Sequence, residues 1–325
     1  MKNFLFKKTV SVVLFFVLSV VTVFAQNAEA KLAEATSHFS KGNYDKALEG
    51  FKEVFFSTYA PYPALLIGDM YMQGYGTEVN YLAAIEFFKS VADIQTSEKD
   101  DLELRIMVSY GCRNCALLTM IETDAYNDSV LAYFNKAHEL TGDAMSEYLL
   151  GLYYENDKED LEKAIYFYDQ SQSKDCICAI EHLAQIYDEE DPDMAFSLHL
   201  RAANIGIMAN ANIDNMYSPL TNPNLANPLV ENSRNCALAN VAIYLENQGD
   251  AREALEYLLK ITDMTAERYV QRGYCYAIID QKEKALQDFE SSLQLEETGL
   301  VYNAYATCYD HIWNDPAKAE FSLLS

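Results

Sequence analysis

The stretch LLIGDMYMQGYG, from Leu65 to Gly76, places three glycines at fixed offsets in an otherwise helix-forming run. A glycine inside a helix costs about 1 kcal/mol relative to alanine, so Gly68 predicts a closely packed partner helix that offsets this cost. Gly74 and Gly76 predict the end of the helix and a turn, because glycine adopts positive φ angles without a Cβ clash. With Ala84 keeping the following helix slim where it crosses the first, the stretch predicts a helix-turn-helix pair.

The composition favours long helices joined by short turns. Proline (7) and glycine (12) are scarce among the 325 residues, and half of the chain is hydrophobic, which is enough for one large domain or two. The formal net charge of −25 opposes binding to DNA, RNA and anionic membranes, which need dense Lys and Arg. Two interpretations of the acidity stay open: a well-solvated surface, or attraction to basic partners.

The first 25 residues have the layout of a secretory signal peptide. A start with three lysines precedes an apolar run from Val10 to Phe24, and Val23 and Ala25 supply small residues before a cleavage site. The apolar run is shorter than the ~20 residues that a membrane-spanning helix needs, although an uncleaved anchor is the alternative. We therefore expect a signal peptide at 1–25 and an exported mature chain, 26–325, that is periplasmic or secreted without stable membrane insertion.

The helix-pair pattern recurs along the chain. Gly151 and Tyr154 repeat the spacing of Gly68 and Tyr71. Small or β-branched anchor residues of the second helices recur at steps that are mostly 31 to 37 residues, close to the ~34 residues of one well-known helical repeat class. These anchors are Ala47, Ala84, Val130, Ala164, Ala195, Ala254, Ala285 and a position near 317.

These motifs resemble Sel1-like repeats and, towards both ends, tetratricopeptide (TPR) repeats, over nearly all of the mature chain. The resemblance implies an all-α fold, a right-handed α-solenoid of stacked helix-turn-helix repeats. Repeats are expected at 26–217 and 233–325, with an inter-repeat loop at 218–232 because Pro219, Pro223 and Pro228 oppose helix formation. Two departures are Arg272, at a usually apolar position, and the 104–140 unit, which lacks the glycine signature.

The resemblance also implies a concave groove, lined by the first helix of each pair, that binds an extended peptide or a partner helix. We therefore predict a protein or peptide partner, for which the acidic charge would favour a basic one, and no nucleic acid. The last unit ends in apolar Phe321, Leu323 and Leu324 without a polar cap, which would allow a homodimer through the C-terminal repeat. The predicted groove residues are Leu32, Thr36, Phe39, Ala239, Ile243, Val270 and Tyr274.

No motif in the sequence predicts a catalytic, cofactor or metal site. Gly74-Tyr75-Gly76 lacks the third glycine of a dinucleotide fingerprint, and the Ser-x-x-Lys at 171–174 lacks its companion motifs. The acidic turn at 188–193 has no glycine at the sixth position of a calcium loop. We therefore expect a non-enzymatic scaffold, with no catalytic residue, no cofactor and no metal.

Two alternatives stay open. Cys112 and Cys115 form a Cys-x-x-Cys pair, which would suit a thiol-redox protein, although the pair falls well inside a predicted helix rather than at a helix N-terminus. The simpler interpretation of the seven cysteines is buried thiols in helix packing, and their odd number leaves one unpaired. The other alternative, which rests on analogy within the repeat family, is a regulator of an envelope or cell-wall enzyme.

Overall fold

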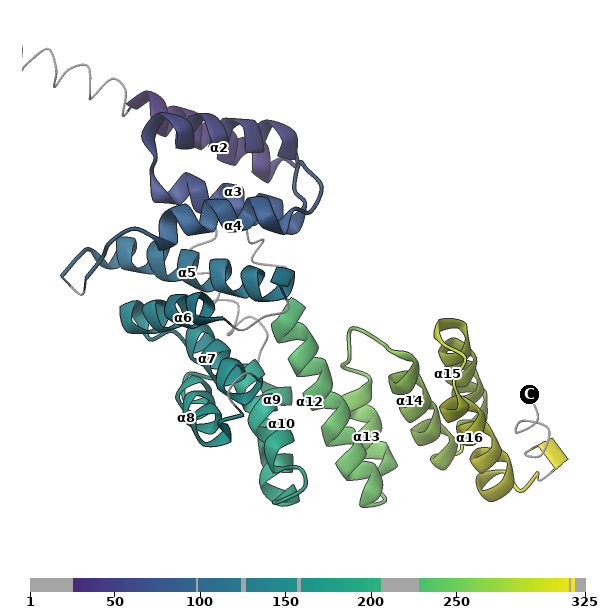
Figure 1. Ribbon diagram of the computed structural model, residues 1–325. Helices are drawn as coiled ribbons and strands as arrows, with labels where there is room; N and C mark the ends of the chain where they lie inside the picture. The colour runs from purple at the N-terminus through teal and green to yellow at the C-terminus, as the bar shows by residue number, and fades with distance from the viewer. Residues whose placement is uncertain are drawn as a thin grey trace, which may run out of the picture. The chain divides into compact units, whose positions relative to one another are not determined.

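The computed structural model describes residues 26–97, 99–123, 127–156, 159–205, 228–315 and 317–318 (Figure 1). These residues form helices that follow one another in pairs, which confirms the predicted all-α helical-repeat fold. Within these ranges, no helix combines the length and hydropathy that a membrane crossing requires. The predicted signal peptide, most of the predicted loop and the apolar C-terminal residues lie outside the described residues.

The chain divides into two compact units, and the division falls between Glu159 and Asp160. The described helices of the first unit are residues 26–40, α2 (Tyr44–Thr58), α3 (Pro61–Gln73), α4 (Tyr81–Ala92), α5 (Leu102–Thr123), α6 (Asp128–Thr141) and α7 (Ala144–Asn156). Those of the second unit are α8 (Leu161–Gln172), α9 (Ile177–Tyr187), α10 (Pro192–Asn204), α12 (Pro228–Asn247), α13 (Ala251–Leu258), α14 (Ala266–Ile278), α15 (Lys282–Leu295), α16 (Gly299–Thr307) and the π-helical turn η1 (Cys308–Ile312).

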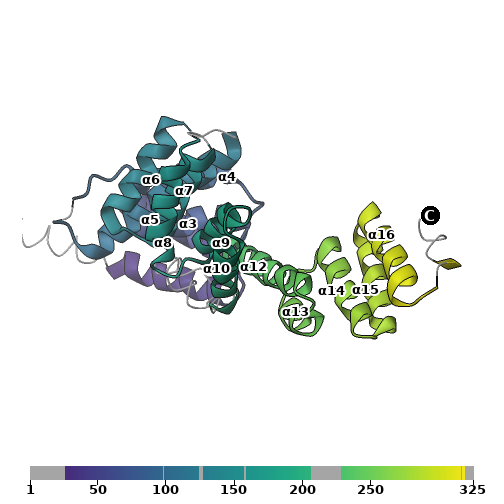
Figure 2. The same ribbon diagram turned by 90° about the horizontal axis from the view of Figure 1, so that it is seen from below.

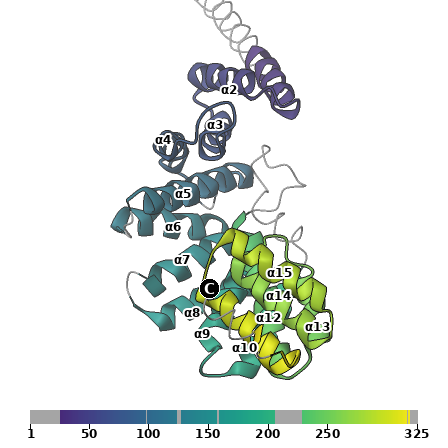
Figure 3. The same ribbon diagram turned by 90° about the vertical axis from the view of Figure 1, so that its right-hand side faces the viewer.

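Within each unit the helices stack in chain order. Figure 3 shows α2 to α6 succeeding one another in the first unit, and Figure 2 shows α12 to α16 doing so in the second. Several first helices also contact the first helix of the next pair: α3 contacts α5, α9 contacts α12, α12 contacts α14, and α14 contacts α16. In each unit, these contacts place first helices next to one another along one side. We call this side the inner face of the unit.

The anchor positions predicted for the second helices are confirmed. Seven of them lie in α2, α4, α6, α8, α10, α13 and α15, and each is at most 1% exposed. A side chain larger than alanine or valine at these positions would push apart helices that touch there. They are Ala47, Ala84, Val130, Ala164, Ala195, Ala254 and Ala285.

Gly68 allows α4 to approach α3. A Cβ atom on Gly68 would lie 2.7 Å from the ring of Phe88, which is fully buried. The same joint recurs in the second unit, where a Cβ on Gly273 would lie 2.7 Å from the buried ring of Phe289. The connection is seven residues long between α3 and α4 but only three between α14 and α15, which accounts for the different offsets of the two pairs. One packing rule therefore operates in both units.

The turn after α3 requires its two glycines. Gly74 and Gly76 have φ angles of 74° and 69°, in the left-handed region where glycine is favoured. A Cβ on Gly76 would also meet the backbone of Tyr44. The adjacent rings of Tyr75 and Tyr44 lie 4.8 Å apart between centroids. The turn of the second repeat is thereby packed against the first.

Two details differ from the sequence-based expectations. The predicted loop at 218–232 is helical in its last five residues, because α12 begins at Pro228. Proline fits the first position of a helix, where its missing N–H would have no partner in any case. Arg272 stands at a position that is usually apolar in these repeats. The position accepts its charge because the guanidinium pairs with the Asp288 carboxylate, with N–O distances of 2.8 and 2.7 Å.

We predict that Gly68→Ala destabilises the protein by about 1–3 kcal/mol, because the added methyl group overpacks the contact with Phe88. The midpoint and slope of urea unfolding measure this change. Gly299→Ala is the control, since a Cβ there meets no atom within 4 Å. An unchanged midpoint for Gly68→Ala would contradict the proposed role of this glycine.

Candidate functional site

The predicted groove residues of the first unit lie together on the helix at 26–40. Leu32 and Phe39 are half-buried and pack against the core, and the Phe39 ring contacts those of Tyr44 and Tyr75 at centroid distances of 5.0 and 5.5 Å. Thr36 is exposed, and its hydroxyl donates to the carbonyl oxygen of Leu32 over 2.8 Å. On this helix, Thr36 therefore offers the most accessible of the three side chains.

In the second unit the predicted groove residues lie on α12 and α14 but differ in exposure. Ala239 and Val270 are only 9% and 7% exposed, so their side chains serve mainly in packing. Ile243 is 48% exposed, and Tyr274 is half-buried. Ile243 and Tyr274 are therefore the two residues of this set that can offer side-chain surface.

Two contacts join the segments of α12 and α14 that carry Ile243 and Tyr274. The side-chain amide of Gln271 donates to the carbonyl oxygen of Ala239 over 3.1 Å. One turn further along α14, the Cys275 thiol contacts a Glu246 carboxylate oxygen at 3.8 Å. Ile243 lies between Ala239 and Glu246 along α12, and Tyr274 lies between Gln271 and Cys275 along α14. The two predicted residues therefore lie on segments of α12 and α14 that contact each other.

A buried polar network joins α9, α10 and α12. The His199 ring contacts Glu181 through Nδ1 at 2.8 Å and Asp188 through Nε2 at 3.2 Å. Glu181 also accepts a hydrogen bond from the Asn240 side chain over 2.9 Å. Burial lowers the pKa of His199, but the hydrogen bonds and charges of Glu181 and Asp188 outweigh it, so that the net pKa is raised. This network fixes three helices of the second unit.

A second buried network surrounds Asp143 between α6 and α7. Its carboxylate contacts the Arg113 guanidinium at 2.8 Å and accepts hydrogen bonds from Ser146 and Thr141. Burial opposes the charged form, but Arg113 and the hydrogen bonds outweigh it and lower the pKa of Asp143 to about 2. No sequence motif indicates either network, because Asn240 and Glu181 are 59 residues apart and Arg113 and Asp143 are 30 residues apart.

The Cys-x-x-Cys pair lies in the interior of α5, and both thiols are buried. Burial is the largest influence, and it raises the pKa of Cys112 to about 12 and that of Cys115 to about 11. A redox-active thiol needs a lowered pKa and access to its substrate. These surroundings therefore weigh against the thiol-redox alternative. Of the seven cysteines, all of which the structure describes, six are buried and Cys236 is half-buried.

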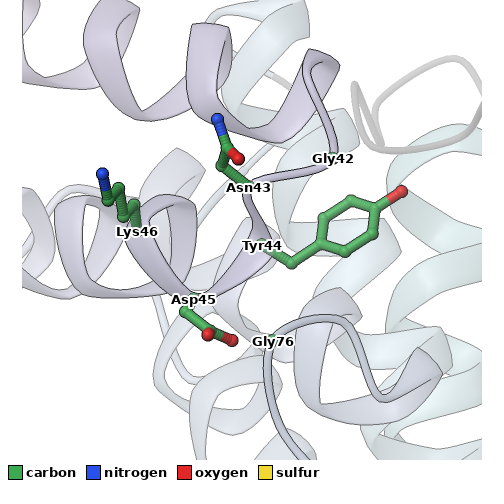
Figure 4. A pocket seen from close by; sticks show the side chains of 6 residues that line it. All are labelled: Gly42, Asn43, Tyr44, Asp45, Lys46 and Gly76. Atoms are coloured by element: carbon green, nitrogen blue, oxygen red, sulfur yellow. The ribbon is translucent and has the colours of Figure 1, made fainter.

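A shallow pocket at the start of α2 offers no site for chemistry. It is lined by residues 42–46 and Gly76. Figure 4 shows the side chains of Asn43, Tyr44, Asp45 and Lys46 diverging from this turn rather than converging. Within the described ranges, no three His, Cys, Asp or Glu residues are grouped so as to hold a metal ion. The inner face is therefore the better candidate.

We predict that Cys236 is the first cysteine to react with a thiol reagent in the folded protein, because the other six thiols are buried. Burial also raises the pKa of Cys236, so this phase should be faster than the others without being as fast as that of an activated thiol. Absorbance after addition of an aromatic disulfide reagent counts the reacting thiols, first in buffer and then in denaturant. Cys236→Ser should remove the rapid phase. Rapid reaction of Cys112 or Cys115 would instead revive the redox alternative.

We predict that Asp143 contributes about 2 kcal/mol to stability at neutral pH. Because its pKa is lower in the folded state, this contribution is present above the unfolded-state value of about 4. It is lost as the pH falls from about 4 to about 2. Urea unfolding of Asp143→Asn at several pH values measures it, with the exposed Glu256→Gln as the control of equal charge change. A stability difference that does not shrink in acid would contradict the assignment.

Comparison with known proteins supports the fold. No family model and no curated protein matches this sequence. Among solved structures, the chain is similar to a Sel1 repeat protein from Oxalobacter formigenes, with a TM-score of 0.58 and 17% sequence identity, covering 82% of this chain and 100% of that one. It also matches a tetratricopeptide repeat protein from Parabacteroides merdae, with a TM-score of 0.42 and 15% identity, covering 86% and 97%. At 17% identity, the similarity to the Sel1 repeat protein shows a Sel1-like helical-repeat fold and nothing of function.

Proposed function

We propose that this protein is an exported, non-enzymatic scaffold of the bacterial cell envelope that binds a protein or peptide partner on its inner face. The observation that carries the proposal is the accessible surface of Ile243 and Tyr274 on two adjoining first helices, α12 and α14. One of these side chains is 48% exposed and the other half-buried, and both belong to the face that stacked first helices present. Aromatic residues with accessible surface are typical anchors of protein interfaces.

The charge of the chain supports a basic partner. With a formal charge of −25, the chain attracts cationic surfaces and repels nucleic acids. The buried charged groups of both networks hold helices together, so they are engaged in packing rather than poised for catalysis. A partner that is itself an envelope or cell-wall enzyme would make the scaffold its regulator.

We predict that replacing both Ile243 and Tyr274, as Ile243→Ser with Tyr274→Asn, weakens partner capture at least tenfold. Loss of a central aromatic anchor commonly costs about 2 kcal/mol of binding free energy or more. Immobilised mature chain captures proteins from the host envelope extract, with washes at physiological salt and then near ~1 M, where the Debye length falls to about 3 Å. Immobilising the retained protein and capturing the mature chain with it then confirms that the two proteins bind each other.

The control for this experiment is Leu259→Ser with Leu295→Ser. These leucines are 56% and 59% exposed. Leu259 directly follows α13 and Leu295 ends α15, so both belong to second helices rather than to the first helices that define the inner face. Thermal melting checks that all variants are folded. A partner lost by the inner-face variant and kept by the control supports the proposal. If both variants retain the partner equally well, the inner face is not the binding surface.

We predict that the exported protein begins at Gln26. Intact-mass measurement of the protein recovered from the envelope and the medium tests this directly. Ala25→Arg should block cleavage, because signal peptidase needs a small residue before the cut. A mature mass that includes residues 1–25 would indicate an uncleaved anchor and would contradict this part of the proposal.

A further inference from the structure

Carboxylates in the described core each face a hydrogen-bond donor or a basic side chain. Such pairing is expected, because a carboxylate removed from water is costly unless other groups compensate it. The pairs are Asp69 with Tyr110, Asp143 with Arg113, Glu147 with His138, Glu181 with His199 and Asp288 with Arg272.

Glu246, on the inner face of the second unit, departs from this rule. It is half-buried in the last turn of α12, and among the described residues its side chain has no basic partner. Its hydrogen-bond partner is the Cys275 thiol at 3.8 Å, a weak donor. Burial raises the pKa of Glu246, and the thiol contact offsets this only in part.

The position of Glu246 in α12 further disfavours its negative charge. The helix ends at Asn247, so the carboxylate lies where the helix dipole places partial negative charge. Both the local burial and the dipole therefore disfavour the negative charge. A cation at this position would be favoured by the carboxylate and by the end of the helix together.

The surroundings suit a long side chain with a charged end. Ile243, one turn before Glu246 on α12, is 48% exposed, and Ile278, one turn after Cys275 on α14, is 43% exposed. Tyr274 directly precedes Cys275, whose thiol contacts Glu246. Burial raises the pKa of Tyr274, and Cys308 and Glu246 raise it further. An aliphatic stem can lie on the isoleucines, and an aromatic ring adds attraction for a cation.

We propose that Glu246, Ile243, Tyr274 and Ile278 form a subsite for a lysine side chain of the bound partner. This inference rests on the proposed function and specifies the chemistry that the inner face recognises. The Cys275 thiol already contacts Oε2 of Glu246, which leaves Oε1 to accept a further hydrogen bond. A single acceptor suits the lysine amine better than the planar arginine fork, which binds both oxygens of a carboxylate. The lysine amine would pair with the Glu246 carboxylate, and the methylene chain of the lysine would cover Ile243.

Nuclear magnetic resonance with a matched pair of probes tests the subsite on the mature chain. The probes are N-acetyl-lysine methylamide and N-acetyl-norleucine methylamide, which share the aliphatic chain and differ in the amine. Ionic strength is held constant while resonances of Glu246 and Tyr274 are followed. The expected result is a saturable shift with the lysine probe that is at least tenfold weaker with the norleucine probe and in Glu246→Gln.

Glu256→Gln is the control, because it removes the same charge from an exposed position on α13. It should leave the lysine titration unchanged. Glu246→Gln should also melt at the same or a higher temperature, since it removes an uncompensated charge; a lower melting temperature would assign Glu246 to a structural role and overturn the proposal. Equal responses to both probes, or no saturable response at Glu246, would also overturn it. Partner capture that depends on Ile243 and Tyr274 would then still stand, so the two proposals fail separately.

Discussion

The close approach of a phenylalanine ring to a glycine on the neighbouring helix closes one helix pair in each unit, and the stacking of the adjacent helices depends on this contact. Phe88 occupies the space that a side chain at Gly68 would fill, and Phe289 does the same at Gly273. Each ring is fully buried, so the helix pair closes without a void. The helix penalty of one glycine is offset by burying an aromatic ring, which contributes roughly 2–3 kcal/mol. Once each pair is closed, neighbouring pairs can stack with their first helices in contact.

Polar contacts then join neighbouring elements within each unit. The first unit uses Asp143 with Arg113, and the second uses Glu181 with His199 and Asn240. Replacing one member of such a buried network leaves the others without partners, so these groups specify how consecutive repeats pack. Because their charges are compensated internally, they contribute little to the surface that a partner meets. Glu246 differs because the described residues leave its charge without a basic counterpart.

The local features of the fold could be predicted from sequence. Gly68, Gly74 and the alanine anchors act within one helix pair, where spacing along the chain determines position in space. The polar networks could not be predicted from sequence. Glu181 and Asn240, for example, are 59 residues apart and meet only because the repeats stack in a particular register. The candidate site shows the same limit: Ala239 and Ile243 lie one turn apart on the same helix, yet one is buried and the other exposed. Exposure depends on how far α14 covers α12, which spacing alone does not determine. Pro228 is a further case, since it starts a helix rather than preventing one.

Site-specific photocrosslinking in the native host tests the central claim most directly. A photoreactive phenylalanine analogue is placed at Ile243 or Tyr274 on the inner face, and at Glu256 on α13 as the comparison. The binding-scaffold account predicts that irradiation joins one partner protein to the chain from the two inner-face positions and not from position 256. Crosslinks from position 256 alone, or from all three positions equally, would contradict it.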